Sequence, residues 1–299
     1  MTSGLKQRLT QEPAILAPGA YDALSALLIQ QAGFEAIYVS GASIAYTQLG
    51  RPDLGLVAMD HLGEIVGRIR ERVHLPLIVD ADTGFGNALN VARTVKRLER
   101  NGASVIQIED QQFPKRCGHL DGKALIEAQE MVGKLAAAVD ARASAETLII
   151  ARTDAVAVEG FERALERAAL YVRAGADILF VEAVRSVQQM RELTRSLGSV
   201  VPLVANMVEG GLTPILSVQE LTEIGFRLVI SPGALVRAVI PAAEAFLASL
   251  KASGSSRPSM HQMTDLMGVN HRIGLDAMLE LAASYEDRAT QLTTGRTVD

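Results

Sequence analysis

The chain has 299 residues, of which 48% are hydrophobic and 21% charged, and these proportions are typical of a globular protein rather than a disordered one. A net charge of −5 without a basic stripe predicts no positively charged surface that could bind nucleic acid. A single cysteine excludes an internal disulfide and fits a reducing compartment. The N-terminal residues lack the apolar core of a signal peptide, and no uncharged apolar run reaches membrane-spanning length. We therefore expect a cytoplasmic protein that binds neither nucleic acid nor a membrane.

Short apolar segments alternate with longer helix-like segments along most of the chain. The short segments are nearly continuous in apolar residues, as expected of strands buried on both faces of a parallel sheet. Strands are predicted at residues 14–17, 36–39, 76–79, 104–108, 147–151, 178–181, 202–205 and 228–230. Helices are predicted at residues 22–32, 59–73, 88–101, 124–141, 161–174, 187–197, 218–224 and 234–252. Eight such alternations predict an α/β protein with a (β/α)₈ TIM-type barrel over residues 1–252.

A segment rich in glycine, serine and proline, residues 252–259, follows the eightfold pattern. Beyond it, residues 260–268 and 271–286 read as amphipathic helices in a C-terminal extension, residues 253–299. Their apolar residues need a surface to cover, which is either the barrel or a neighbouring subunit.

Polar residues follow the predicted strands. The carboxyl ends of barrel strands converge on one face, which is the face that carries active sites. The residues placed around this face are Asp80, Asp82, Glu109, Arg152, Glu182 and Asn206.

Four acidic residues are candidate metal ligands: Asp53, Asp80, Asp82 and Glu109. An all-oxygen set suits a hard divalent cation, so Mg²⁺ is the expected occupant and Mn²⁺ the alternative. Helix capping is the competing interpretation of these residues, because aspartate begins helices well.

Arg152 is a candidate ligand for a substrate carboxylate, because a guanidinium can donate two parallel hydrogen bonds. It can equally be a structural partner of Glu182 or Asp154. The small residues 40–42 (Ser-Gly-Ala) offer successive backbone N–H groups for a carboxylate, and Asn206 offers an uncharged donor.

The only cysteine, Cys117, lies in a loop with Lys115, Arg116 and His119. Nearby positive charge favours a thiolate, so a reactive sulfur is expected here. The alternative is a small buried hydrophobic residue, which is the more usual state of an unpaired cysteine.

In their order along the chain, these motifs resemble the isocitrate lyase/phosphoenolpyruvate mutase superfamily, in its branch that contains 2-methylisocitrate lyase and 2,3-dimethylmalate lyase. The matching segments are residues 18–23, 40–41, 49–55, 80–87, 108–111, 115–119, 151–155 and 206–211. The resemblance implies that Mg²⁺ is held by Asp80, with Asp53, Asp82 and Glu109 supporting it through waters.

The resemblance also implies roles for residues that bind substrate. Ser40, Gly41 and Ala42 would take the carboxylate of a 2-oxo acid fragment, and Arg152, Glu182 and Asn206 would face the other carboxylate. Cys117 would be the acid/base of a gating loop in which Lys115, Gly118 and His119 contact substrate. Tyr38 would lie near the bond that is cleaved. The resemblance thus implies catalytic roles for Cys117, Tyr38, Arg152 and Glu182.

The implied activity is cleavage of a 2-hydroxy di- or tricarboxylate into a 2-oxo acid such as pyruvate and a carboxylic acid, through an aci-carboxylate. Residues 120–123 and 206–211 look more like 2,3-dimethylmalate lyase and carboxyphosphonoenolpyruvate mutase than like 2-methylisocitrate lyase. The alternatives are an oxaloacetate hydrolase or decarboxylase, a carboxyphosphonoenolpyruvate phosphonomutase, and a binding protein without activity. The resemblance further implies a homo-oligomer, a dimer of dimers in which C-terminal helices are swapped between subunits.

Overall fold

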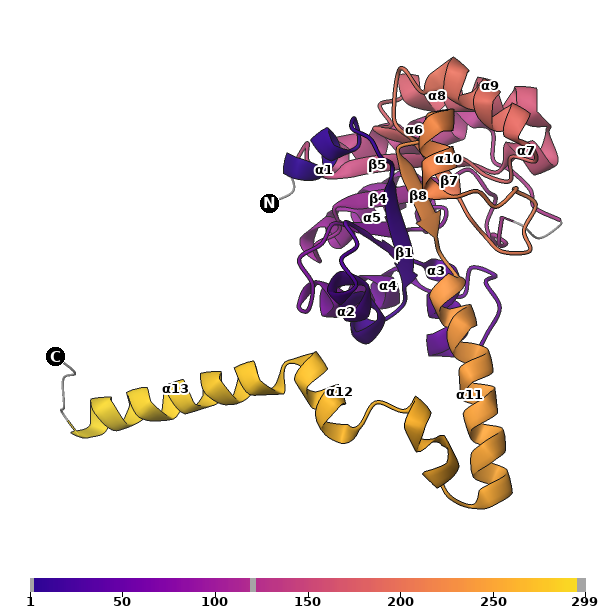
Figure 1. Ribbon diagram of the computed structural model, residues 1–299. Coiled ribbons are helices and arrows are strands. Elements are labelled where there is room, and N and C mark those ends of the chain that lie inside the picture. The colour runs from indigo at the N-terminus through magenta and orange to yellow at the C-terminus, as the bar shows by residue number, and fades with distance from the viewer. Residues whose placement is uncertain (1–2, 119–121, 295–299) are drawn as a thin grey trace. The chain divides into compact units, whose positions relative to one another are not determined.

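Eight parallel strands close into a barrel in chain order, with β1 pairing with β8 (Figure 1). The structure is a computed structural model that describes residues 3–118 and 122–294. The strands are β1 (Ile15–Ala20), β2 (Ile37–Val39), β3 (Leu77–Asp80), β4 (Val105–Glu109), β5 (Leu148–Thr153), β6 (Ile178–Val181), β7 (Leu203–Asn206) and β8 (Leu228–Ser231). The predicted (β/α)₈ barrel is confirmed.

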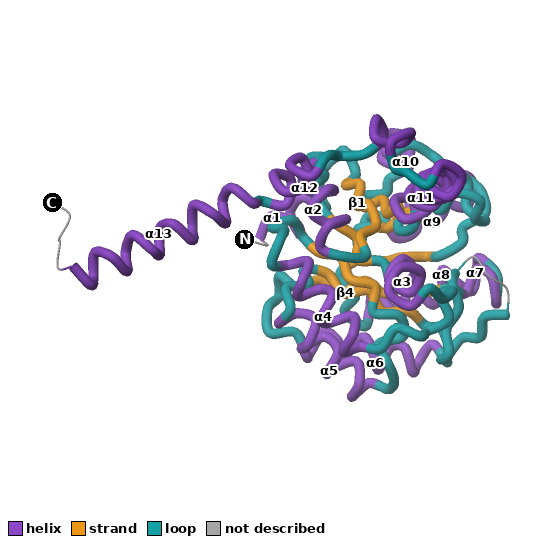
Figure 2. Tube along the Cα trace, turned by 90° about the horizontal axis from the view of Figure 1, so that it is seen from below, coloured by secondary structure: helices purple, strands orange, loops and turns teal. Residues whose placement is uncertain are grey.

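Helices follow the strands, and those up to residue 224 pack around the outside of the barrel (Figure 2). Those that the sequence predicts are α2 (Ala23–Gln31), α4 (Met59–Arg70), α5 (Ala88–Arg100), α6 (Ala128–Ala141), α8 (Phe161–Arg173), α9 (Val187–Leu197), α10 (Val218–Ile224) and α11 (Ala234–Ser253). Short helices that it does not predict are α1 (Ser3–Arg8), α3 (Gly41–Ile44), the π-helical turn η1 (Ala45–Leu49) and α7 (Ala155–Val158). These are too short to show a helical period.

Apolar side chains cover both faces of the sheet, inside the barrel and between the barrel and the outer helices. Tyr38, Ile78 and Phe180 belong to the inner cluster, whereas their neighbours Val39 and Val79 pack against the helices outside. This alternation explains why the strands are apolar throughout. The register pairs Glu109 of β4 with Arg152 of β5, so both side chains lie at the same level of the barrel.

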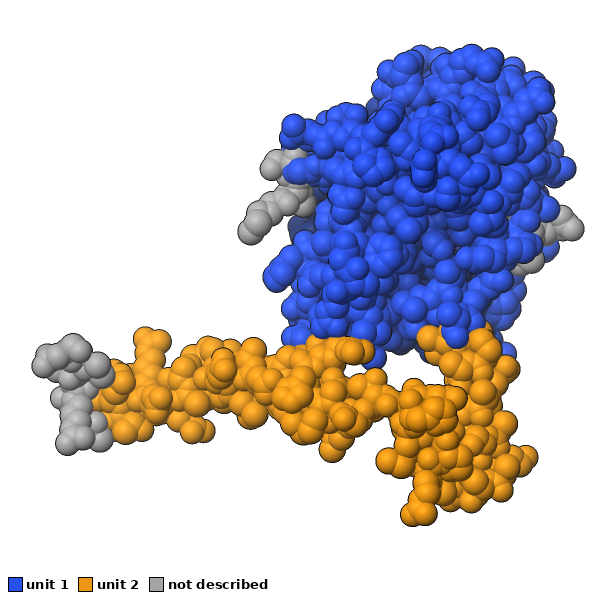
Figure 3. All heavy atoms as spheres, viewed as in Figure 1, with its two compact units in different colours: residues 1–238 blue, residues 239–299 orange. Residues whose placement is uncertain are grey.

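The chain divides into two compact units, Met1–Ala238 and Val239–Asp299 (Figure 3). The second unit contains most of α11, the 3₁₀ helix η2 (Arg257–Gln262), α12 (Leu266–Ile273) and α13 (Leu275–Thr294). The prediction of a helix over residues 260–268 is wrong, because the Asp265 carboxylate accepts from the Gly268 N–H at 2.6 Å and caps a helix that begins only at Leu266. The predicted domain boundary at residue 252 remains a prediction.

The second unit exposes many large apolar side chains. Leu266, Met278 and Leu281 are all more than half exposed. Along the described residues, no helix is both long and apolar enough to cross a membrane.

Candidate active site

The carboxyl ends of the strands bring the predicted site residues together. β3 ends at Asp80, β4 at Glu109 and β7 at Asn206, and the polar residue is itself the last residue of each strand. The chain adds Arg152 within β5 and Glu182 directly after β6. All are buried. Beside them lies a cavity of about 240 Å³, whose lining includes Tyr38, Ala42, Cys117, Gly118, Arg152 and Glu182.

Asp53, Asp80, Asp82 and Glu109 form what we call the acid cluster. Lys115 lies within it: its Nζ is 2.6 Å from Asp53 Oδ1 and 2.7 Å from Asp82 Oδ1, and the lysine is only 4% exposed. Lys115 therefore offsets part of the negative charge of the acid cluster and is not part of the cavity lining, although the resemblance implies a substrate contact for it.

Burial makes the acid cluster electrostatically costly. It raises the pKa of Asp82 to about 7, with Asp80 adding to the rise and Lys115 opposing it. Burial likewise raises the pKa of Glu109 well above its usual range, and the nearby Arg152 opposes this. Neither carboxylate oxygen of Glu109 accepts a hydrogen bond from the described chain. The cluster thus has more negative charge than the protein compensates.

The acid cluster suits a divalent cation, because the cation would compensate its excess negative charge. Within the acid cluster, Asp53 and Asp82 form ion pairs with Lys115, and Glu109 forms one with Arg152, which also pairs with Asp154 and Glu182. The carboxylate oxygens of Glu109, which accept no hydrogen bond from the described chain, are metal ligands of the type that Mg²⁺ prefers. Within the described residues, however, no three acidic, histidine or cysteine side chains are already arranged around one metal position.

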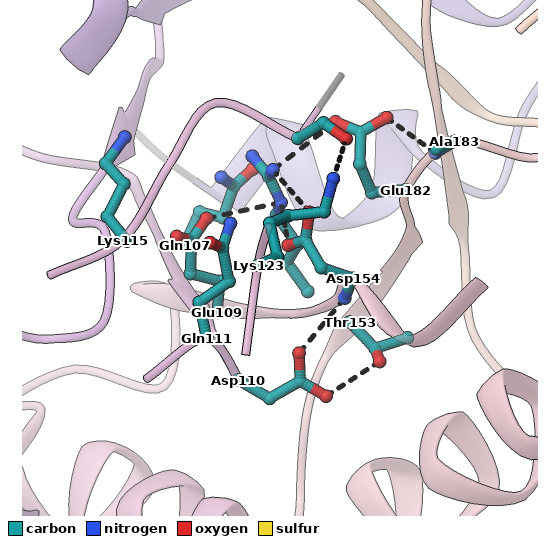
Figure 4. Close-up of polar contacts among 12 residues, drawn as sticks. Gln107, Glu109, Asp110, Gln111, Lys115, Lys123, Thr153, Asp154, Glu182 and Ala183 are labelled. Carbon is teal, nitrogen blue, oxygen red and sulfur yellow. Dashed lines mark hydrogen bonds and ion pairs between the residues drawn. The ribbon is translucent and has the colours of Figure 1, made fainter. Parts of the chain in front are cut away.

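Arg152 is clamped by three carboxylates, those of Glu109 at the end of β4, Asp154 directly after β5 and Glu182 directly after β6. These three side chains are labelled in Figure 4. Its Nε and Nη2 donate to Asp154 at 2.9 and 3.1 Å, and these atoms lie 3.3 Å from Glu109 Oε2 and 3.5 Å from Glu182 Oε2. The guanidinium stacks over Phe180, 5.1 Å from the ring centre. Arg152 therefore has structural partners and also lines the cavity, and its role as a ligand for a substrate carboxylate remains a prediction.

Glu182 is fixed from two sides. Its Oε1 accepts from the Ala183 N–H at 2.7 Å and its Oε2 from Asn206 Nδ2 at 2.9 Å. The other side-chain atom of Asn206, Oδ1, accepts no hydrogen bond within the described chain. Asn206 consequently orients Glu182 with one end of its amide.

The cysteine loop lies directly against the Arg152 clamp. A Cβ added to Gly118 would be 2.5 Å from Arg152 Nη2 and 2.6 Å from Glu182 Cγ, so only glycine allows this approach. Lys123 Nζ donates to the Gly118 carbonyl. The half-buried Cys117 borders the cavity, and its role as an acid/base remains a prediction. His119, predicted to contact substrate, lies outside the described residues.

Ser40 has a structural task that the sequence does not reveal. Its hydroxyl accepts from the Ser43 N–H at 3.2 Å and caps α3. Gly41 and Ala42 form the first helical turn, whose N–H groups have no carbonyl partner within the helix. A Cβ at Gly41 would lie 3.4 Å from Asp80 Oδ2, so this backbone passes next to the acid cluster.

Gln107 is a site residue that sequence reasoning missed. Its Oε1 accepts from the Tyr38 hydroxyl at 3.2 Å, and its Nε2 donates to Asp80 Oδ1 at 3.1 Å. Burial and the charge of Asp80 raise the pKa of Tyr38 well above its usual range, which keeps the phenol protonated as a donor. A polar residue in the middle of an apolar strand was the available signal.

Comparison with known proteins places this barrel and site in a family. The family model described as Phosphoenolpyruvate phosphomutase matches residues 5–251. The chain belongs to this family, the phosphoenolpyruvate mutase/isocitrate lyase superfamily. It is 45% identical to 2-methylisocitrate lyase of Aeropyrum pernix, over 98% of this chain and 95% of that protein. It is 39% identical to 2,3-dimethylmalate lyase of Eubacterium barkeri, over 94% of this chain and 96% of that protein.

Solved structures agree with this membership. A crystal structure of 2,3-dimethylmalate lyase matches with a TM-score of 0.90 and 35% identity, covering 95% of each chain. Oxaloacetate acetylhydrolase bound to 3,3-difluorooxalacetate matches with a TM-score of 0.90 and 32% identity, over 95% of this chain and 97% of the other. Phosphonopyruvate hydrolase with oxalate and Mg²⁺ matches with a TM-score of 0.85 and 30% identity, over 95% and 98%.

Proposed function

We propose that this protein is a Mg²⁺-dependent carbon–carbon lyase that cleaves a 2-hydroxy di- or tricarboxylate of the 2,3-dimethylmalate or 2-methylisocitrate type into pyruvate, or another 2-oxo acid, and a carboxylic acid. The observation that carries the proposal is that an arginine clamp and a thiol border one cavity beside a buried acid cluster. Lyases with these substrates in their names are 39–45% identical to the chain. A cavity of about 240 Å³ suits a small acid.

The acid cluster supplies the site for the metal. Asp80 would hold Mg²⁺ with Asp53, Asp82 and Glu109 around it, and the bound ion would lower the pKa of the substrate's C2 hydroxyl. Lys115 would have to release Asp53 and Asp82 or share them with the ion, because it binds both now. The N–H groups of Gly41 and Ala42, in the first turn of α3, would bind the carboxylate of the 2-oxo acid fragment.

The rest of the cavity would handle the second fragment. When the C2–C3 bond breaks, its electron pair passes to the C3 fragment as an aci-carboxylate. Arg152 and Asn206 would stabilise this charge, with Glu182 and Asp154 holding the guanidinium in place. Cys117 would donate the proton that converts the aci-carboxylate into the free acid. Tyr38, held protonated, would orient the reacting bond through its hydroxyl.

The test is release of 2-oxo acid by the full-length protein with Mg²⁺. We would compare 2,3-dimethylmalate, 2-methylisocitrate, isocitrate, citramalate and oxaloacetate in a coupled pyruvate assay. Release of pyruvate from a methylated 2-hydroxy acid supports the proposal. Turnover of oxaloacetate alone contradicts it.

Oxaloacetate hydrolysis or decarboxylation is the second candidate. It is favoured by the match to oxaloacetate acetylhydrolase, whose TM-score equals that of 2,3-dimethylmalate lyase. Oxalate and acetate as products of oxaloacetate identify the hydrolase. A third candidate, carboxyphosphonoenolpyruvate phosphonomutase, would form a P–C bond that ³¹P NMR detects.

We also propose that the protein works in the cytoplasm as a homo-oligomer, a dimer of dimers in which the second unit covers part of another copy. The support is the exposure of large apolar side chains in the second unit, among them Leu266 (77% exposed) and Met278 (65% exposed). Groups of exposed apolar side chains are normally covered by another protein surface. Leu266→Asp combined with Met278→Asp should lower the mass measured by light scattering. An unchanged mass would contradict this arrangement.

A further inference from the structure

The loop after β3 is a tight turn with a strained residue of the acid cluster at its centre. The Gly84 N–H donates to the Ala81 carbonyl at 2.8 Å, which leaves Asp82 and Thr83 as the two central residues. Asp82 has φ +48°, in the left-handed region, and of the two central residues only Asp82 does. A turn with positive φ at its first central position usually has glycine there. Asp82 therefore keeps this conformation only if surrounding contacts impose it.

The three backbone carbonyl groups that follow Ala81 each accept a hydrogen bond from a different donor. The carbonyls of residues 82, 83 and 84 accept, in that order, from the Glu109 N–H at 2.9 Å, Lys134 Nζ at 3.2 Å and Thr94 Oγ1 at 3.1 Å. Two of these donors are side chains of the outer helices α5 and α6 rather than of the barrel. The turn is consequently held from behind by residues that do not line the cavity.

Lys134 is an unusual donor for this task. It is 4% exposed, makes no ion pair within the described chain, and has the Thr83 carbonyl as its only hydrogen-bond acceptor there. Burial lowers the pKa of its ammonium group, with Glu130 opposing the change. A buried ammonium group is costly unless it is hydrogen-bonded. The single bond to the Thr83 carbonyl therefore accounts for the buried position of Lys134.

We propose that Lys134 is a positioning residue of the acid cluster: by fixing the Thr83 carbonyl from α6, it keeps Asp82 left-handed and its carboxylate within the acid cluster, where a divalent cation would bind. Thr94, which holds the next carbonyl from α5, does the same with a neutral hydroxyl. The inference rests on the proposed function only in taking the acid cluster as the place where a divalent cation binds.

The test uses Mn²⁺ as the probe, with its binding to the full-length protein measured by electron paramagnetic resonance. Lys134→Met keeps the length of the side chain but removes the donor. Losing a charged hydrogen bond should weaken Mn²⁺ binding about tenfold, which corresponds to about 1.4 kcal/mol. Thr94→Val should weaken it in the same direction, and Lys134→Arg should restore most of the affinity because it remains a donor. Turnover at saturating Mg²⁺ should change far less than Mn²⁺ affinity.

Lys96→Met is the matched control, since Lys96 is exposed on α5 and makes no hydrogen bond or ion pair with the described residues of the turn. Wild-type Mn²⁺ affinity in a folded Lys134→Met protein would overturn the inference. If Lys134→Met does not fold, wild-type affinity in Thr94→Val overturns it instead. If the wild type binds Mn²⁺ and the variants bind it weakly, but no substrate yields a 2-oxo acid, the inference stands and the proposed function fails. A wild type that binds no Mn²⁺ overturns the inference.

Discussion

Gly118→Ala is the most direct test of the close contact between the cysteine loop and the arginine clamp. The added methyl group would lie 2.5 Å from Arg152 Nη2, 2.6 Å from Glu182 Cγ and 2.8 Å from Glu182 Oε2. Neither partner can yield easily, because Asp154 and Asn206 hold them by buried hydrogen bonds. The loop must therefore retreat by about 1 Å to reach an ordinary contact distance. Cys117, the preceding residue, moves with it.

A displacement of about 1 Å at a reacting group typically lowers the rate about 100-fold, so we expect kcat to fall by that factor. The assay is steady-state pyruvate release, with the rate of Cys117 alkylation as a second measure of loop position. Gly67→Ala is the control, since a Cβ there meets no heavy atom within 4 Å. It should be fully active and slightly more stable. A Gly118→Ala enzyme with wild-type kcat would refute the role given to this contact.

Three further substitutions test the proposed roles. Cys117→Ser should lower kcat by about two to four powers of ten with little change in KM, because serine is too weak an acid; near-normal kcat would favour decarboxylation. Asp80→Asn should abolish both turnover and Mn²⁺ binding, and full activity after exhaustive chelation would contradict a metal requirement. Arg152→Lys cannot keep both bonds to Asp154, and losing one charged bond, about 1.5–3 kcal/mol, should lower kcat/KM about 10- to 100-fold; an unchanged value would assign Arg152 a structural role only.

The barrel could be predicted because its strands are buried on both faces and so appear as apolar runs. The predicted ends of β3, β4 and β7 stop one residue short of the observed ends, since Asp80, Glu109 and Asn206 are polar yet complete these strands. The helix at Leu266 was placed too early, because apolar periodicity does not reveal which residue provides the cap.

The site could be predicted as a set but not as a network. Parallel strands of a barrel place their ends together, which is enough to group the carboxylates with Arg152. The position of Lys115 inside the acid cluster depends on the path of its loop, and the two bonds from Arg152 to Asp154 depend on rotamers. Gln107 links Tyr38 to Asp80 through the barrel interior, which no local pattern encodes.

The measurement that tests the central claim most directly is proton NMR of the products formed from 2,3-dimethylmalate in D₂O. Cleavage of C2–C3 with protonation by a thiol that exchanges with solvent predicts equal amounts of pyruvate and propionate, with one deuterium at C2 of each propionate. The same reaction with Cys117→Ser should be too slow to detect on the same timescale. No pyruvate from 2,3-dimethylmalate or 2-methylisocitrate, with oxaloacetate consumed instead, would contradict the lyase account.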